Sequence, residues 1–258
     1  MKSINEIFSV KDKVILITGA SSGFGKHFAL TLSNAGAKII LSARRQEALD
    51  KLSKEIKNSG NESIVIPLDV SSKDSVTNLI KESESKMGHI DVLINNAGIS
   101  DPTWFKDLSE ESWLNVMEIN LNGAFRVAKQ VSELMTRQER PGSIINITSI
   151  LGLRVGVQHT SYAVSKAGLT QLTKMMALEL ARNNIRVNAI APGYIQSEMT
   201  ENFFKTAEGK NYMNKIPQRR FGDLQHLDGV ILLLASEASS FMTGSVITVD
   251  GGHLINPL

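Results

Sequence analysis

Two side chains that can exchange a proton stand four residues apart in this sequence, Tyr162 and Lys166. The surrounding pattern predicts a helix, so both side chains project from one helix face. A phenol titrates at about pH 10, but a neighbouring ammonium stabilises the phenolate and lowers that pKa. Such a pair suits the protonation of a carbonyl oxygen during its reduction, or the reverse reaction on an alcohol. An ordinary exposed contact between residues four apart is the alternative interpretation.

A glycine-rich turn near the start of the chain has the features of a phosphate-binding loop. The run Thr18-Gly19-Ala20-Ser21-Ser22-Gly23-Phe24-Gly25 follows a β-branched segment and opens a predicted helix. Glycines there let the backbone approach a pyrophosphate, and the free N–H groups of a helix N-terminus attract its charge. A tight strand-to-helix turn also explains the glycines, but the place after the first strand of a βαβ repeat favours dinucleotide binding.

The elements that must position these groups alternate along the chain, short β-branched runs with longer amphipathic ones. The runs typical of strands are Lys13–Thr18, Lys38–Ser42, Ser63–Leu68, Asp91–Ile94, Ser143–Thr148, Arg186–Ala191 and Ser245–Val249. The stretches typical of helices are Gly25–Asn34, Gln46–Lys57, Ser72–Lys86, Glu110–Glu133, Tyr162–Arg182 and Leu227–Ala235. Several strands are apolar on both faces, as in a parallel sheet between two helix layers. The pattern therefore predicts an α/β fold, a doubly wound, Rossmann-type parallel sheet of about seven strands flanked by helices.

No linker-like stretch divides the chain, so we expect one dinucleotide-binding and catalytic domain over residues 1–258. The longest region without clear periodicity runs from about residue 193 to residue 220. Long irregular segments often close over a substrate, and we expect a substrate loop here.

Composition excludes several classes of function. The 258 residues include 28 basic and 26 acidic side chains, a net charge of +2, which is too even for a nucleic-acid footprint or an anionic membrane surface. The absence of cysteine excludes disulfides, thiolate metal sites and a cysteine nucleophile. No cluster of His, Asp and Glu in the sequence resembles a metal site, and no apolar run is long enough for a membrane span. We expect a cytoplasmic protein without nucleic-acid, membrane or metal partners.

Five motifs together resemble those of the short-chain dehydrogenase/reductase family, in its compact single-domain branch. They are the Thr18–Gly25 turn, Asn95-Asn96-Ala97-Gly98 after the fourth strand, Ser149, the pair Tyr162 and Lys166, and Pro192-Gly193 after the sixth strand. All five occur in the family's order and on its elements, and the resemblance covers Lys11 to Gly252. It implies an NAD(P)(H)-dependent oxidoreductase that moves a hydride between a nicotinamide and a carbonyl or secondary alcohol.

The resemblance also implies a catalytic set of four residues, Asn120, Ser149, Tyr162 and Lys166. Tyr162 would be the acid or base, and Lys166 would lower its pKa and hold the nicotinamide ribose. Ser149 would hydrogen-bond the substrate oxygen, and Asn120 would support a water relay to the lysine. By its residue type alone, Asn120 is equally well a buried amide bonded to backbone.

For the cofactor the resemblance implies a longer set of residues. Asp69 and Val70 stand where the family cradles adenine, and Ile195 stands where a backbone group meets the nicotinamide carboxamide. A cap at the start of the next helix is a second role open to Asp69. The full set is Gly19, Ser21, Ser22, Gly23, Phe24, Gly25, Arg44, Asp69, Val70, Asn96, Ala97, Gly98, Tyr162, Lys166, Pro192, Gly193 and Ile195.

The end of the second strand bears on the choice of cofactor. Relatives that prefer NAD carry an aspartate where Ala43 stands, and that carboxylate would repel a 2′-phosphate. Arg44 is placed to bind such a phosphate through a charge-assisted, bidentate contact. Arg44 and Arg45 as solvated residues opening a helix are the alternative, and Ser22 stands where NADP-dependent relatives often carry a basic residue. We therefore expect NADP(H), with NAD(H) as the alternative.

The expected substrate is a small molecule with a carbonyl or a secondary alcohol, and two enzyme classes share these motifs. One is similar to the 3-oxoacyl-thioester reductases of the family, and the other to its sugar and polyol dehydrogenases. The expected substrate loop suits a partly apolar substrate, although its side chains also suit packing within the loop: Met199, Phe203, Phe204, Tyr212 and Met213. A third hypothesis is a non-catalytic, cofactor-sensing regulator, but such relatives lose the tyrosine or the lysine.

Two expectations concern the surroundings of the catalytic pair. His159 and Gln158, just before Tyr162, are candidates for the wall of the substrate pocket, and for His159 a plain loop role is the alternative to a second acid. The family is usually tetrameric, so the resemblance implies a homotetramer. Apolar residues spread over more than one face of the Tyr162–Arg182 helix, which suits such an interface and equally a core within one chain.

Overall fold

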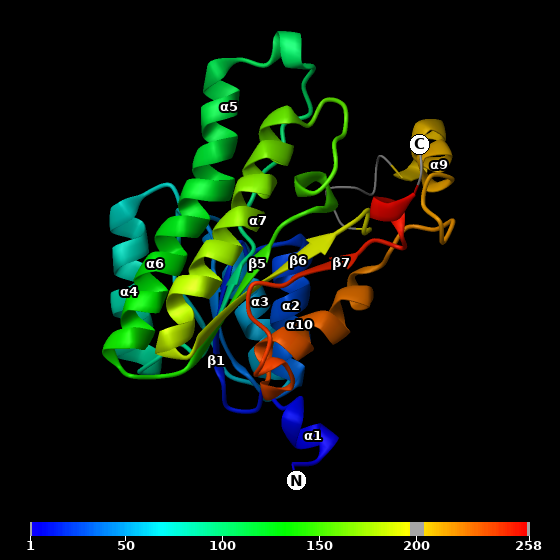
Figure 1. Cartoon of the computed structure of the whole chain (residues 1–258). Helices are drawn as coiled ribbons and strands as arrows, with labels where there is room; N and C mark the ends of the chain where they lie inside the picture. The colour runs from blue at the N-terminus through cyan, green and yellow to red at the C-terminus, as the bar shows by residue number, and fades with distance from the viewer. Residues whose placement is uncertain (1, 197–203, 257–258) are drawn as a thin grey trace.

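The computed structural model of the chain describes residues 2–196 and 204–256. These residues form a seven-stranded sheet in which every neighbouring pair is parallel, in the order β3-β2-β1-β4-β5-β6-β7 (Figure 1). The strands are β1 Val14–Thr18, β2 Lys38–Ser42, β3 Ser63–Val65, β4 Val92–Asn95, β5 Gly142–Ile147, β6 Ile185–Pro192 and β7 Val246–Val249. The strand order reverses between β1 and β4, which leaves a crevice at their carboxyl ends. The predicted doubly wound sheet is confirmed.

Helices cover both faces of the sheet. One face carries α2 (Gly23–Asn34), α3 (Gln46–Asn58) and α10 (Asp228–Ala235), and the other carries α4 (Lys73–Met87), α6 (Ala124–Arg137) and α7 (Thr160–Leu180) (Figure 1). Successive side chains of a strand point to opposite faces, so each strand supplies both layers. In β1, Ile15 and Ile17 join the first core, whereas Val14 and Leu16 join the second. This division is why the sequence of β1 is apolar at every position.

The remaining elements are short. They are α1 (Ile4–Ile7), α5 (Glu110–Met117), α9 (Ala207–Met213) and the 3₁₀ turns Phe105–Asp107, Ile150–Gly152, Ala181–Asn183, Leu224–Leu227, Glu237–Ser239 and His253–Ile255. The Ser3 hydroxyl and the Glu6 carboxylate cap α1 reciprocally. None of the helices among the described residues has the length and apolar character needed to cross a membrane.

The predicted helix Glu110–Glu133 is interrupted. After α5 the backbone forms a π-helical turn over Glu118–Gly123, and α6 then continues to Arg137. Gly123 is packed so closely on the chain that a Cβ there would lie 2.7 Å from Val70 Cγ2. The wider turn buries Asn120 completely, and π-helical turns often mark functional sites.

The third strand is shorter than the predicted Ser63–Leu68. Its ladder ends at Val65, two residues before Pro67. The chain nevertheless stays beside β2, since the N–H groups of Ile66 and Leu68 donate to Leu41 and Ala43. This path brings Leu68 and Asp69 to the crevice.

Part of the expected substrate loop packs on itself. Phe204 stacks on Phe221 with ring centres 3.7 Å apart, and Tyr212 lies 4.4 Å from Tyr194 by the same measure. These aromatic side chains are therefore packing groups, as the sequence allowed. Met199 and Phe203 lie outside the described residues, and the closing of this segment over a substrate stays a prediction.

Candidate active site

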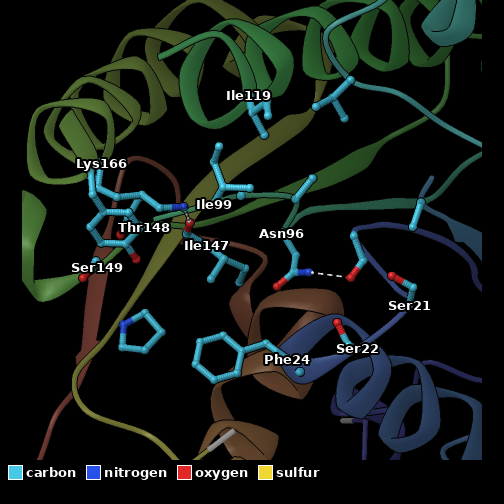
Figure 2. A pocket seen from close by; sticks show the side chains of 18 of the residues that line it. Ser21, Ser22, Phe24, Asn96, Ile99, Ile119, Ile147, Thr148, Ser149 and Lys166 are labelled. Atoms are coloured by element: carbon cyan, nitrogen blue, oxygen red, sulfur yellow. Dashed lines mark hydrogen bonds between the residues drawn. The ribbon is translucent and has the colours of Figure 1, made fainter. Parts of the chain in front are cut away.

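A cavity of about 460 Å³ opens at the carboxyl ends of β1, β2, β4, β5 and β6, in the crevice where the strand order reverses (Figure 2). Open parallel sheets bind their ligands at this place. The cavity is lined by every expected cofactor residue except Gly25, and by Ser149, Tyr162 and Lys166 of the expected catalytic set. Gly25 and Asn120 lie directly behind this lining. The structure thus brings the separate motifs together in one cavity.

The hydroxyl of Thr18 joins the ends of β1 and β4. It donates to the Ile94 carbonyl oxygen at 3.4 Å and accepts from the N–H groups of Asn96 and Ala97, both at 3.0 Å. Thr18 is almost completely buried, so these backbone groups depend on it rather than on water. The sequence analysis gave this side chain no role of its own.

The phosphate loop is shaped by close contacts between its glycines and Asn96. The Asn96 amide donates to the carbonyl oxygens of Thr18 at 3.0 Å and of Gly19 at 3.2 Å (Figure 2). Gly19 has a φ of +66°, and a Cβ on Gly25 would lie 2.4 Å from the Gly19 oxygen, so neither position admits a side chain. The Ser22 side chain does not cap α2, which leaves the first-turn N–H groups of that helix to an anion.

Two guanidinium groups stand at the end of β2. Arg45 lies across the phosphate loop, where its Nη2 donates to Ser21 Oγ at 3.1 Å and to Ser22 Oγ at 2.5 Å. Arg44 lines the same cavity, and its charge contributes to lowering the pKa of Asp69. The sequence analysis assigned the phosphate contact to Arg44 and missed the contact of Arg45 with the loop.

Asp69 lines the cavity, where the adenine contact stays a prediction, and the cap of the next helix that its position also suggested is made by Ser72 instead. The Asp69 Oδ1 accepts from the Ser71 N–H at 2.9 Å and from the Ser71 hydroxyl at 2.6 Å, and these bonds are the main cause of its lowered pKa. Asp69 therefore fixes the turn before α4, while Ser72 caps that helix through the N–H of Ser75.

Lys166 is held inside the molecule by one backbone oxygen. Its Nζ donates to the Ile147 carbonyl at 2.8 Å and lies 5.6 Å from the centre of the Tyr162 ring (Figure 2). The residue is only 4% exposed, and burial lowers the pKa of its ammonium to about 8. Lys166 therefore remains charged at neutral pH, close to the point at which it gives up its proton.

The phenol of Tyr162 differs from the expectation. Burial raises its pKa, and a hydrogen bond with the Ser149 side chain opposes only part of that effect. Lys166 does not lower the pKa of Tyr162 as expected, because its ammonium donates its hydrogen bond to the Ile147 carbonyl oxygen and not to the phenol oxygen. A phenol of this kind is protonated at neutral pH, which suits a proton donor better than a base.

The other two residues of the expected catalytic set lie on either side of this pair. Ser149 is nearly buried at the end of β5, and its Oγ accepts from the Leu151 N–H at 3.1 Å. Asn120 accepts from the Ile99 N–H at 2.8 Å and donates to the Ile99 oxygen at 2.9 Å and to Ser165 Oγ at 3.1 Å. Both amide protons of Asn120 are thus used within the fold, where they fix the cavity residue Ile99. A water relay through Asn120 stays a prediction.

Comparisons with known proteins agree with this arrangement. A family model described as enoyl-(acyl carrier protein) reductase matches residues 19–253. The 3-oxoacyl-[acyl-carrier-protein] reductase FabG of Thermotoga maritima is 42% identical over 246 residues, which are 95% of this chain and 99% of that protein. A short-chain type dehydrogenase/reductase from Mycobacterium marinum has a crystal structure similar at a TM-score of 0.92 and 37% identity, covering 97% of this chain and 99% of that chain. The chain belongs to the short-chain dehydrogenase/reductase family.

This short-chain dehydrogenase/reductase is an NAD(P)-dependent oxidoreductase. A second similar crystal structure is that of a gluconate 5-dehydrogenase from Burkholderia cenocepacia in complex with NADP and tartrate, with a TM-score of 0.93 at 32% identity over 97% of this chain and 98% of that chain. The two names describe different substrates on one fold. Family membership therefore fixes the reaction class and leaves the substrate to the site.

The cavity of this short-chain dehydrogenase/reductase fits a dinucleotide. Side-chain-free backbone at Gly19 and Gly25 and the uncapped start of α2 leave room and N–H groups for phosphates. At the far end, β6 leads through Pro192 to Gly193, whose N–H donates to Val249 at 3.0 Å, and on to the buried Ile195. Four apolar residues of the lining were not expected from the sequence, namely Leu68, Ile99, Ile119 and Ile147.

Proposed function

We propose that this enzyme uses NADPH to reduce the ketone of a 3-oxoacyl thioester to the 3-hydroxyacyl thioester. The observation that carries the proposal is the convergence of Ser149, Tyr162 and Lys166 on one end of the dinucleotide cavity. These three groups are what carbonyl reduction needs, an orienting donor, a proton donor and a cation beside it. Burial raises the pKa of Tyr162, so the phenol carries the proton that carbonyl reduction requires.

In the proposed reaction Ser149 and Tyr162 act on the carbonyl oxygen of the substrate, and Lys166 acts on Tyr162. NADPH held by the phosphate loop and Lys166 would supply the hydride that reduces the carbonyl carbon. Ser149 Oγ donates a hydrogen bond to the carbonyl oxygen and Tyr162 transfers its hydroxyl proton to that oxygen, so the ketone becomes an alcohol. The ammonium of Lys166 stabilises the phenolate that remains, and its own pKa of about 8 lets it pass on a proton. Asn120 positions Ile99 from behind the cavity wall.

The preference for NADPH rests on the end of β2. Ala43 leaves no carboxylate against a 2′-phosphate, and the guanidinium groups of Arg44 and Arg45 line that part of the cavity. Arg45 already bridges Ser21 and Ser22 of the phosphate loop. A 2′-phosphate bound there would meet two fixed positive charges.

The acyl-thioester class is supported by exposed apolar side chains on two loops that lead away from the cavity residues Ile99 and Ser149. Trp104, Phe105, Leu153, Val155 and Val157 are all exposed, and we call them the apolar rim. They belong to the two loops that follow Ile99 and Ser149, and a hydrogen bond from the Thr103 N–H to the Gln158 oxygen at 2.9 Å joins these loops. Exposed apolar residues on joined loops that leave the cavity suit a binding surface for an acyl chain.

The test follows the loss of NADPH absorbance with acetoacetyl-CoA and the purified protein. We expect oxidation that depends on the substrate and disappears in Tyr162→Phe, which removes one oxygen and leaves the ring. The variant should bind NADPH as the wild type does, as measured by the quenching of cofactor fluorescence. Turnover retained by Tyr162→Phe would refute the assigned mechanism, and a wild type that binds NADPH without oxidising it would refute the thioester substrate.

A sugar or polyol dehydrogenase is the second candidate. It is favoured by the structural similarity to the gluconate 5-dehydrogenase of Burkholderia cenocepacia. Rapid formation of NADPH from NADP and gluconate, with no reaction of acetoacetyl-CoA, would select it. A non-catalytic regulator is disfavoured because both Tyr162 and Lys166 are present and line the cavity.

We further propose that residues 1–258 act as one domain that assembles into a homotetramer in the cytoplasm. The exposed apolar side chains of α5, α6 and α7 support an interface, namely Leu114, Phe125, Val164, Met175 and Leu178. The absence of cysteine suits a reducing compartment. Light scattering after size-exclusion chromatography tests the assembly, and a monomer mass at micromolar concentration would contradict it.

A further inference from the structure

His159 is fixed beside the proposed proton donor without serving the fold through its ring. It stands at the start of α7, where its carbonyl accepts from the Ala163 N–H at 2.7 Å, and its backbone pairs with Thr103 of the neighbouring loop. Its ring meets the Tyr162 ring edge-on, with ring centres 6.3 Å apart. The backbone contacts would be the same for any residue, so they do not explain an imidazole here.

The two ring nitrogens of His159 have different surroundings. Neither has a hydrogen-bond partner among the residues that the structure describes, and only Nδ1 is enclosed. Burial lowers the pKa of His159, so the ring is neutral at pH 7 and carries one proton. An enclosed N–H without a partner costs more than an enclosed lone pair, which assigns the proton to Nε2. A free Nε2–H donor therefore stands beside the ring of Tyr162, just outside the residues that line the cavity.

We propose that His159 Nε2–H binds a second oxygen of the substrate, close to the carbonyl that is reduced. The inference rests on the proposed reduction of a carbonyl and narrows its substrate. In a 3-oxoacyl thioester the second oxygen is the thioester carbonyl, which one methylene separates from the ketone. His159 caps the helix that carries Tyr162, and the two rings are in edge-on contact, so one small molecule can meet both side chains.

The same donor explains how the site would reject a plain ketone. A ketone without a second oxygen leaves the Nε2–H desolvated and unpaired in the closed complex, and such unpaired groups are strong determinants of specificity. His159 would thus act as a binding residue that selects 1,3-dioxygenated substrates. The proton for the reaction would still come from Tyr162.

Two variants separate this role from a structural one. His159→Phe keeps a flat ring of similar size without nitrogen, and His159→Gln keeps a neutral N–H donor. Initial rates with NADPH are compared for acetoacetyl-CoA and for cyclohexanone, which has a single oxygen. We expect His159→Phe to lower kcat/KM for acetoacetyl-CoA by about 10- to 100-fold, mainly through KM, and that for cyclohexanone by less than about threefold. His159→Gln should recover most of the loss.

Each outcome decides the proposal. Equal losses with both ketones, or no loss with either, would overturn it, since the ring would then support Tyr162 or do nothing. A wild type inactive on acetoacetyl-CoA would end the proposed thioester function but not this inference, which is then measured with 5-ketogluconate against cyclohexanone. Selective loss of 5-ketogluconate reduction in His159→Phe would support the inference, and failure of the wild type on both oxygenated substrates would overturn it.

Discussion

Replacing Gly25 with alanine should damage the phosphate loop by a calculable amount. The new Cβ would lie 2.4 Å from the Gly19 carbonyl oxygen and 2.6 Å from Asn96 Nδ2, whereas ordinary contact begins at 3.4 Å. The loop must therefore open by about 1 Å, and overpacking of this kind costs about 1–3 kcal/mol. The higher helix propensity of alanine returns about 0.5–1 kcal/mol. The expected net loss is about 0–2.5 kcal/mol, and a central value of about 1 kcal/mol corresponds to a fall in Tm of about 2–4 °C.

The affinity for NADPH should fall more strongly in Gly25→Ala than the stability of the fold. A shift of about 1 Å moves the backbone N–H groups away from the phosphates, and we expect the Kd for NADPH to rise by more than about tenfold. Gly229→Ala is the matched control, because that glycine is also in the first turn of a helix and its Cβ would meet nothing within 4 Å. Thermal unfolding and NADPH fluorescence give both quantities. Wild-type Tm and Kd in Gly25→Ala would refute the reasoning.

Three further changes test other parts of the site. Thr18→Val removes the hydroxyl that serves two partly buried N–H groups, so the free energy of unfolding in urea should fall by about 1–3 kcal/mol, and an unchanged urea midpoint would contradict this. Folding lowers the pKa of Lys166 from 10.5 to about 8, so the unfolded chain binds the extra proton between these pH values and the stability of the wild type should rise with pH across this window. The rise is at most about 3 kcal/mol, and an equal rise in Lys166→Met would show that another group causes it. Arg44→Ala should raise the KM for NADPH by more than about tenfold and that for NADH by less than about threefold, whereas equal changes would remove Arg44 from the proposed 2′-phosphate site.

The fold could be predicted because its signals are local. The β1 run Val14–Thr18 is apolar at every position, which is typical of a strand buried on both faces, and both cores receive its side chains. The break in the Glu110–Glu133 helix could not be predicted, because α and π turns share nearly the same hydrophobic pattern. The π-helical turn accompanies the close approach of Gly123 to Val70, which is a contact between residues distant in sequence.

Most residues that line the cavity could be predicted from the motifs, but the protonation behaviour of the catalytic pair could not. The motifs identified the cavity residues, but the spacing of Tyr162 and Lys166 implied a lowered phenol pKa, whereas the structure gives a raised one. The difference depends on burial and on the partner of the lysine, Ile147, and neither is encoded in the spacing. The contact of Arg45 with the phosphate loop could not be predicted either, because it joins Arg45 after β2 to Ser21 after β1 and no local pattern encodes it.

The order of the strands also has a consequence for the newly made chain. The cavity takes residues from the ends of five strands, from Gly19 after β1 to Ile195 after β6. A ribosome must therefore release about three quarters of the protein before a dinucleotide has a complete place to bind. Until then the cofactor cannot stabilise the nascent chain by mass action, and early folding depends on packing alone. Cellular cofactor levels should thus affect the survival of the finished enzyme and not its first steps of folding.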